Sequence, residues 1–168
     1  MSYNTPWNRQ ERETMFNQLH KAAFVSLIAL SPLLPVAAAE ELRLRDGISY
    51  YQDTDSGFPI LANKIEDTDH EMGRATFIFF AASGDLNSNR QAKRVVDLYK
   101  HFKDSKIKFV VIDVDHTKTD SAKQMLKTYY QGYIPQEVLL DKNGKKAWSA
   151  NGEVDSHTLE SKVEGVLN

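Results

Sequence analysis

The hydrophobic pattern of the chain is clearest from Arg74 onward. Two continuous apolar runs, Ala75–Ala82 and Ile107–Val114, have the pattern of strands that are buried on both faces of a sheet. Between them, apolar residues recur at helical spacing from Ala92 to Phe102, which predicts an amphipathic helix. Because a helix joins the two runs, we expect the two strands to lie parallel to each other.

Two short sequences have the form of a capping box, in which a hydroxyl and an amide side chain satisfy the first backbone N–H groups of a helix. Ser88-Asn89-Arg90-Gln91 predicts the start of the first helix. Ser121-Ala122-Lys123-Gln124 predicts the start of a second helix that extends to about Tyr130. Gln131-Gly132 ends this second helix, because glycine adopts the left-handed conformation at little cost.

The remaining pattern predicts a hairpin followed by a helix. Glu137–Asp141 and Lys146–Ala150 form two strands, and Asn143-Gly144 between them is a strong hairpin signal. Asp155 or Ser156 caps a last helix that ends near Leu167. The whole order predicts an α/β fold, with a mixed sheet of about four to five strands and helices on both faces.

The first forty residues hold a separate apolar run, Ala22–Ala39, which follows Lys21. A basic residue, an apolar core and an A-x-A ending form the pattern of a secretory signal peptide. An uncleaved membrane anchor and a buried helix are the alternatives. The polar lead before the run is long, so we expect Met15 to be the true start. The pattern predicts a periplasmic or exported protein, or one anchored to the inner membrane.

Residues 40–73 are polar and rich in turn residues. Two short apolar pieces, Ile48–Tyr51 and Pro59–Ile65, predict an edge strand and a short helix. The acidic residues of this stretch are typical of a solvated face. We therefore divide the chain into a leader over residues 1–39, an extension over 40–73 and an α/β domain over 74–168.

The absence of cysteine excludes more functions than any other feature of the composition. It rules out a disulfide, a cysteine nucleophile, a thiolate metal site and dithiol redox chemistry. The formal net charge of −2 gives no basic field that points to nucleic acid.

Other candidate chemistry is sparse. Asp113, Asp115 and His116 begin like a calcium loop, but Lys118 stands where the loop needs glycine and Gln124 where it needs a bidentate acid. The histidines lack zinc-binding spacing, and the chain has no serine elbow, phosphate-binding loop or dinucleotide fingerprint. We expect no metal, no cofactor and no catalytic residue.

From about Ala75 to Leu167 the chain resembles the thioredoxin family. The resemblance lies in four stretches that follow one another in the family's order: TFIFFAAS, VVIDVD, Gly132-Tyr133-Ile134-Pro135 and VLLDKNGKKAWSA. It implies a thioredoxin fold with Pro135 as the family's cis-proline. In the family, the loop of this proline accepts the backbone of an extended peptide. Exported and membrane-anchored members are the most similar in layout.

The chain departs from the family at the redox motif. Thioredoxins place Cys-x-x-Cys between the first strand and the following helix, where this chain has residues 83–89, Ser-Gly-Asp-Leu-Asn-Ser-Asn. Without a thiolate there is no nucleophile for disulfide exchange, and a serine hydroxyl has no such redox couple. The resemblance therefore implies the fold and does not imply the activity.

We expect a redox-inactive envelope protein that binds another protein, as an accessory or assembly subunit of a membrane-associated complex. The candidate surface is the family's substrate side, with the turn Asn151–Glu153 beside it: Ser83, Gly84, Asp85, Leu86, Asn87, Ser88, Asn89, Tyr133, Ile134, Pro135 and Gln136. Pro135 could instead only shape its loop. The alternative functions are a cysteine-independent enzyme that uses the same groove and a structural spacer held by an uncleaved N-terminus. Tyr50, Tyr51, Tyr133 and Trp148 are the aromatic residues expected at the surface, because aromatic side chains are good interface anchors.

Overall fold

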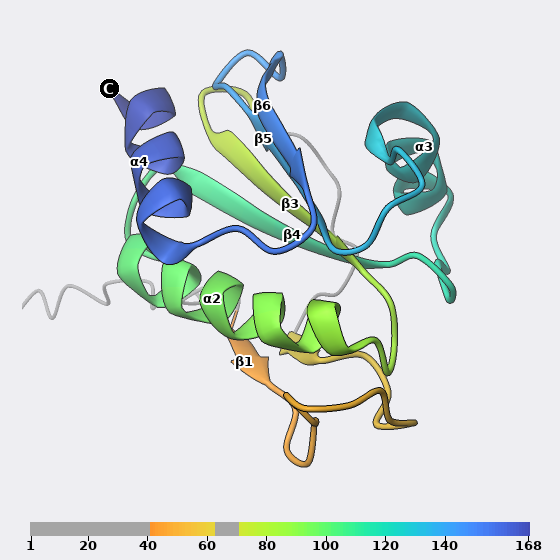
Figure 1. Cartoon of the computed structure of the whole chain (residues 1–168). Helices are drawn as coiled ribbons and strands as arrows, with labels where there is room; N and C mark the ends of the chain where they lie inside the picture. Colours follow the sequence, from red (N-terminus) through yellow and green to blue (C-terminus); the bar gives the residue numbers. More distant parts are fainter. Residues whose placement is uncertain (1–40, 63–70) are drawn as a thin grey trace, which may run out of the picture. The chain divides into compact units, whose positions relative to one another are not determined.

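Figure 1 shows the computed structural model of the chain, which describes residues 41–62 and 71–168. All of these residues belong to one compact unit that comprises Ala39–Asn168. The predicted leader, the Met15 start and residues 63–70 lie outside the described part of the chain.

A four-stranded mixed sheet with the order β4-β3-β5-β6 forms the centre of this unit. Strands β3 (Ala75–Ala81) and β4 (Ile107–Asp113) are parallel, whereas β5 (Gln136–Leu140) is antiparallel to β3 and β6 (Lys146–Asn151) is antiparallel to β5. The predicted sheet is confirmed, and the ends of its four strands differ from the predicted ends by no more than one residue.

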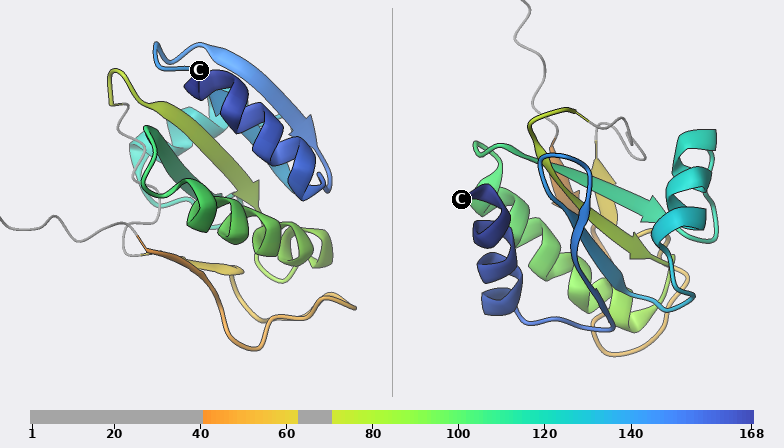
Figure 2. Two further views of the ribbon diagram at one scale, coloured as in Figure 1. Left: turned by 90° about the vertical axis from the view of Figure 1, so that its left-hand side faces the viewer. Right: turned by 90° about the horizontal axis from the view of Figure 1, so that it is seen from above.

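Within residues 41–62 and 71–168, three helices cover the two faces of the sheet. Helices α2 (Leu86–Phe102) and α4 (Ser156–Leu167) lie on one face and α3 (Asp120–Tyr129) lies on the other (Figure 2). Successive side chains of a strand point to opposite faces, so Phe79 joins the core beneath α2 and α4, and Phe80 joins the core beneath α3. This alternation explains why β3 is apolar at nearly every position.

Both predicted capping boxes are wrong, because each helix begins earlier. Asp85 caps α2, and its carboxylate accepts a hydrogen bond from the backbone N–H of Ser88 at 2.6 Å. Thr119 caps α3 and accepts from the backbone N–H of Ala122 at 3.1 Å. Aspartate and threonine are good caps in their own right. The Ser88 hydroxyl accepts instead from the backbone N–H of Ala82, which ties α2 to the end of β3.

The extension forms a second, two-stranded sheet. Strands β1 (Leu42–Leu44) and β2 (Ile60–Ala62) pair antiparallel, and β1 lies against α2 (Figure 1). The predicted strand at Ile48–Tyr51 is wrong, and the predicted helix at Pro59–Ile65 is wrong over its described residues, since Ile60–Ala62 is a strand. Burial of three apolar side chains in the core beneath α2 fixes this arrangement: Leu42, Phe58 and Ile60.

Candidate functional site

The loop between β3 and α2, where thioredoxins place their cysteines, is closed by the protein's own chain. Gly84 has a φ of 77°, and a Cβ added to it would overlap the backbone carbonyl oxygen of Thr54. The backbone N–H of Thr54 donates to the carbonyl of Gly84 at 3.1 Å. Glycine is therefore required here both for its positive φ and for the close approach of the two backbones.

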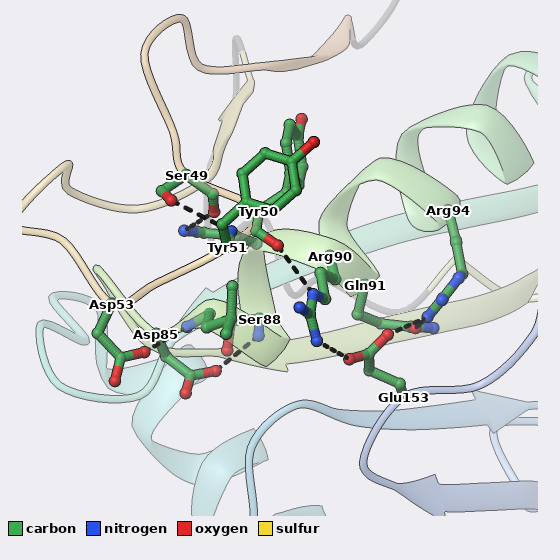
Figure 3. A network of polar contacts seen from close by, with 12 residues as sticks. Ser49, Tyr50, Tyr51, Asp53, Asp85, Ser88, Arg90, Gln91, Arg94 and Glu153 are labelled. Carbon is green, nitrogen blue, oxygen red and sulfur yellow. Dashed lines mark hydrogen bonds and ion pairs between the residues drawn. The ribbon is translucent and has the colours of Figure 1, made fainter.

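Residues 49–57, which we call the cover segment, continue these contacts along the start of α2. The Asp53 carboxylate accepts from the backbone N–H of Leu86 at 2.8 Å, and the Asn89 side-chain amide donates to the carbonyl of Ser49 at 2.9 Å. Figure 3 shows Asp53 and Asp85 side by side at this helix start. Two carboxylates there complement the partial positive charge of the helix N-terminus.

The turn after β6 is tied to the outer side of α2 by ion pairs. Glu153 lies 2.7 Å from Arg94 and 3.6 Å from Arg90, and the Nε of Arg90 also donates to the Tyr50 carbonyl at 3.0 Å (Figure 3). Buried Gln91 lies on the same helix, and its side-chain oxygen accepts hydrogen bonds from Arg94 at 2.8 Å and from the backbone N–H of Val154 at 3.1 Å. One helix face thus connects the cover segment with the 151–155 turn.

Glu137 is a fully buried acid in the middle of the sheet. It lies opposite Phe79 of β3 and Ala150 of β6. Burial raises its pKa to about 8, and the nearby Gln91 amide and the positive charge of Arg94 oppose this only in part. The carboxyl group is therefore mostly neutral at pH 7, which lowers the cost of burying it.

The loop that precedes β5 is held from two sides. The Ile134–Pro135 peptide bond is cis, and the carbonyl of Pro135 accepts from the backbone N–H of Gly152 at 2.7 Å. The buried Gln136 side chain donates to the carbonyl of Tyr129 and accepts from the backbone N–H of Gln131, both at 2.8 Å. These bonds fix the backbone on either side of Tyr133.

The residues of the predicted surface have different environments. Tyr133 is 64% exposed and Ile134 is half-buried, whereas Pro135 and Gln136 are buried. In the 83–89 stretch, Ser88 and Asn89 are buried and Asn87 is exposed, while Ser83, Gly84, Asp85 and Leu86 are half-buried. Residues 133–136 form hydrogen bonds with the end of α3 and with the 151–152 turn. Residues 83–89 form theirs largely with the cover segment.

The four aromatic residues expected at the surface also differ. Tyr51 is 90% exposed, and the Tyr133 ring is the next most exposed of the four. Tyr50 is half-buried, and Trp148 packs partly buried against the core beneath α2. Of these four, Tyr51 and Tyr133 are thus the side chains most available for outside contact.

A cavity of about 520 Å³ opens at the carboxyl ends of β3 and β4. Asp113 forms its buried polar wall, with the Ser83 hydroxyl donating to Oδ2 at 2.8 Å and the His116 Nδ1 lying 3.1 Å from the same oxygen. The other carboxylate oxygen accepts from the backbone N–H of Asp115. The acid therefore lies between the serine and the histidine, which is not the serine–histidine–acid order of an activated serine nucleophile.

Sequence reasoning placed Asp113 and His116 together but missed the other walls of the cavity. Arg45 and Phe58 come from the extension, and Lys118 and Thr119 from the segment before α3. Nothing in the local sequence marks residues 45 and 58 as neighbours of residue 113. Among residues 41–62 and 71–168, no group of three or more histidine or acidic side chains is placed to hold a metal ion. Over the same ranges, no helix combines the length and apolar character that crossing a bilayer requires.

Comparisons with known proteins find similarity in structure only. No family model and no curated protein matches the chain. Among solved structures, a thioredoxin of Fasciola hepatica has 21% identity over 56% of this chain and 83% of its own, with a TM-score of 0.47. Mitochondrial thioredoxin 3 of Saccharomyces cerevisiae has 19% identity over 57% and 81%, with a TM-score of 0.45. A mutant thioredoxin of Halobacterium salinarum has 17% identity over 61% and 82%, with a TM-score of 0.49.

The fold assignment rests on the chain's own topology. The structure has the strand order β4-β3-β5-β6 with helices on both faces. It also has a proline directly before β5, and a closing hairpin and helix. This is the arrangement that the sequence resemblance implies. The described part of the chain therefore has a thioredoxin-like fold, in a protein that contains no cysteine.

Proposed function

We propose that this protein is a redox-inactive binding module that holds a protein partner against the loop of Tyr133 and Ile134. The observation that carries the proposal is the exposed Tyr133 ring on a backbone that is fixed on both sides. An exposed aromatic side chain on a rigid loop loses little entropy on binding, which is the property of an interface anchor.

The closed state of the α2 loop supports a role without catalysis. Gly84, Leu86 and Asn89 already form hydrogen bonds with the cover segment. The loop at which thioredoxins carry their cysteines therefore has a structural role in this chain. With no thiol there, disulfide exchange has no nucleophile. We propose that the protein has no catalytic activity and that the Tyr133 loop is the surface that binds its protein partner.

The test is recovery of partners from native extracts with matched variants. Ile134→Asp and Tyr133→Ser alter the proposed surface, and Tyr51→Ser makes the same change at the other exposed tyrosine of the described residues. We expect at least about tenfold lower recovery of a specific partner with the first two variants and no change with Tyr51→Ser. Equal recovery from all four proteins would rule this surface out.

We also propose that the partner lies in the cell envelope, where this protein serves as an accessory or assembly subunit of a membrane-associated complex. The support is the signal-like run Ala22–Ala39. Amino-terminal sequencing of the native protein tests this location. A mature chain that starts at Glu40 is expected for an exported protein, and a retained apolar run in the membrane fraction is expected for an anchored one. A full-length chain in the cytosol would contradict both.

A further inference from the structure

The cavity at the ends of β3 and β4 has the position and size of a ligand site. In open α/β sheets, ligands bind at the carboxyl ends of parallel strands, and Ser83 and Asp113 stand at the ends of two parallel neighbours. Its volume of about 520 Å³ is within the range of about 300–1,000 Å³ that is usual for small-molecule sites. The Tyr133 loop does not line it.

The polar groups of the cavity favour an anion. The acceptor sites of Asp113 are occupied from within the protein, since Ser83, His116 and the backbone N–H of Asp115 all lie on its two oxygens, and its negative charge is outweighed by two positive side chains of the wall. The remaining charged side chains of the wall, Arg45 and Lys118, are cations. Thr119, which also lines the cavity, is the N-cap of α3, so the positive end of that helix lies at the same wall.

Arg45 is positioned for a planar anion. Its Nε donates to the carbonyl of Phe58 at 2.7 Å, which orients the guanidinium and leaves both terminal nitrogens outside this bond. The guanidinium lies over Gly57, where an added Cβ would be 3.5 Å from its Cζ. A guanidinium held in this way matches the two oxygens of a carboxylate.

Phe58 supplies an apolar wall beside these charges. Its side chain is buried in the core beneath α2 and still borders the cavity. A ligand that uses the whole volume thus needs an acidic end and an apolar body. We propose that this cavity binds a small organic carboxylate, with the acid on Arg45 and Lys118 and the apolar part against Phe58.

The test is calorimetric titration of the full chain with benzoate, and with benzamide as the neutral molecule of the same shape. We expect saturable benzoate binding with a Kd below about 1 mM and no measurable benzamide binding. Inorganic phosphate is the third probe, and we expect it to bind more weakly than benzoate because it has no apolar body. Absence of saturable benzoate binding, equal binding of benzamide, or tighter binding of phosphate would each overturn the proposal.

Variants test the assigned residues. Arg45→Gln is expected to raise the benzoate Kd at least about tenfold, and Arg43→Gln, at an exposed position of β1, leaves it unchanged. Arg45 also bonds to the Phe58 backbone, so its replacement can disturb the structure as well as the site. Lys118→Gln, at the exposed rim, is therefore a second variant, and we expect it to raise the benzoate Kd about threefold or more. Unchanged affinity in both variants would contradict the assignment. The result is independent of partner binding at Tyr133.

Discussion

The Asp53 carboxylate accepts a hydrogen bond at 2.8 Å from the backbone N–H of Leu86, 33 residues further along the chain. Leu86 is the first residue of α2, and the Asp85 carboxylate caps the same helix start. The two acids together satisfy backbone donors at the point where a thioredoxin presents its cysteines. The extension thus holds the start of α2 through hydrogen bonds within the chain.

Removal of the Asp53 contact should destabilise the protein. We expect Asp53→Ala to lower the free energy of unfolding by about 1 kcal/mol, because it loses a hydrogen bond and a favourable charge at a helix N-terminus. Asp53→Asn keeps an acceptor and should lose less. Urea unfolding measures both. Asp55→Ala is the matched control, an exposed acid of the same cover segment, and an equal loss there would contradict the specific role of Asp53.

A side chain at Gly84 should disturb the closed loop. Gly84→Ala places a Cβ against the Thr54 carbonyl in addition to straining a φ of 77°, so we expect a loss of more than about 2 kcal/mol in unfolding free energy. Gly132→Ala is the control, because φ there is 86° and the space around its Cβ is open. It should cost only roughly 1–2 kcal/mol. Equal losses would mean that the approach of Thr54 has no energetic effect.

Glu137 should make stability depend on pH. Its pKa is raised from 4.5 to about 8 in the folded protein, so between these values the folded chain holds a proton that the unfolded chain has lost. This contribution is fully present below about pH 4.5 and is lost as the pH rises to about 8. Relative to wild type, Glu137→Gln should therefore gain stability by on the order of 1 kcal/mol per pH unit within that window and level off above it.

Chemical unfolding of wild type and Glu137→Gln from pH 5 to pH 9 measures this difference and cancels the other titrating groups. Gln is the suitable replacement because it keeps the shape of the neutral acid. A stability difference that stays constant over this range would show that Glu137 does not titrate with a raised pKa.

The central sheet could be predicted because each of its strands has a distinctive pattern. Burial on both faces makes Ala75–Ala81 and Ile107–Asp113 continuously apolar, and a helix between parallel strands leaves few arrangements. Helix starts were harder to predict, since Asp85 and Ser88 are both capable caps three residues apart. Tertiary contacts decided between them, with the Ser88 hydroxyl bonding to β3.

The cover segment and the cavity could not be predicted from local patterns. The segment binds α2 partly through backbone carbonyls, such as those of Ser49 and Tyr50, which any sequence provides. Strands β1 and β2 have three residues each, too few for a periodicity. Gln136 was predicted as a contact residue, but its side chain is used inside its own loop.

The most direct test of the central claim is site-specific photo-crosslinking in native cells. A benzophenone amino acid in place of Tyr133 reports on contacts of the proposed surface, and the same group in place of Tyr51 reports on the other exposed tyrosine. We expect a discrete protein adduct from position 133 that is absent from position 51. No adduct at position 133, or the same adduct from both positions, would contradict it.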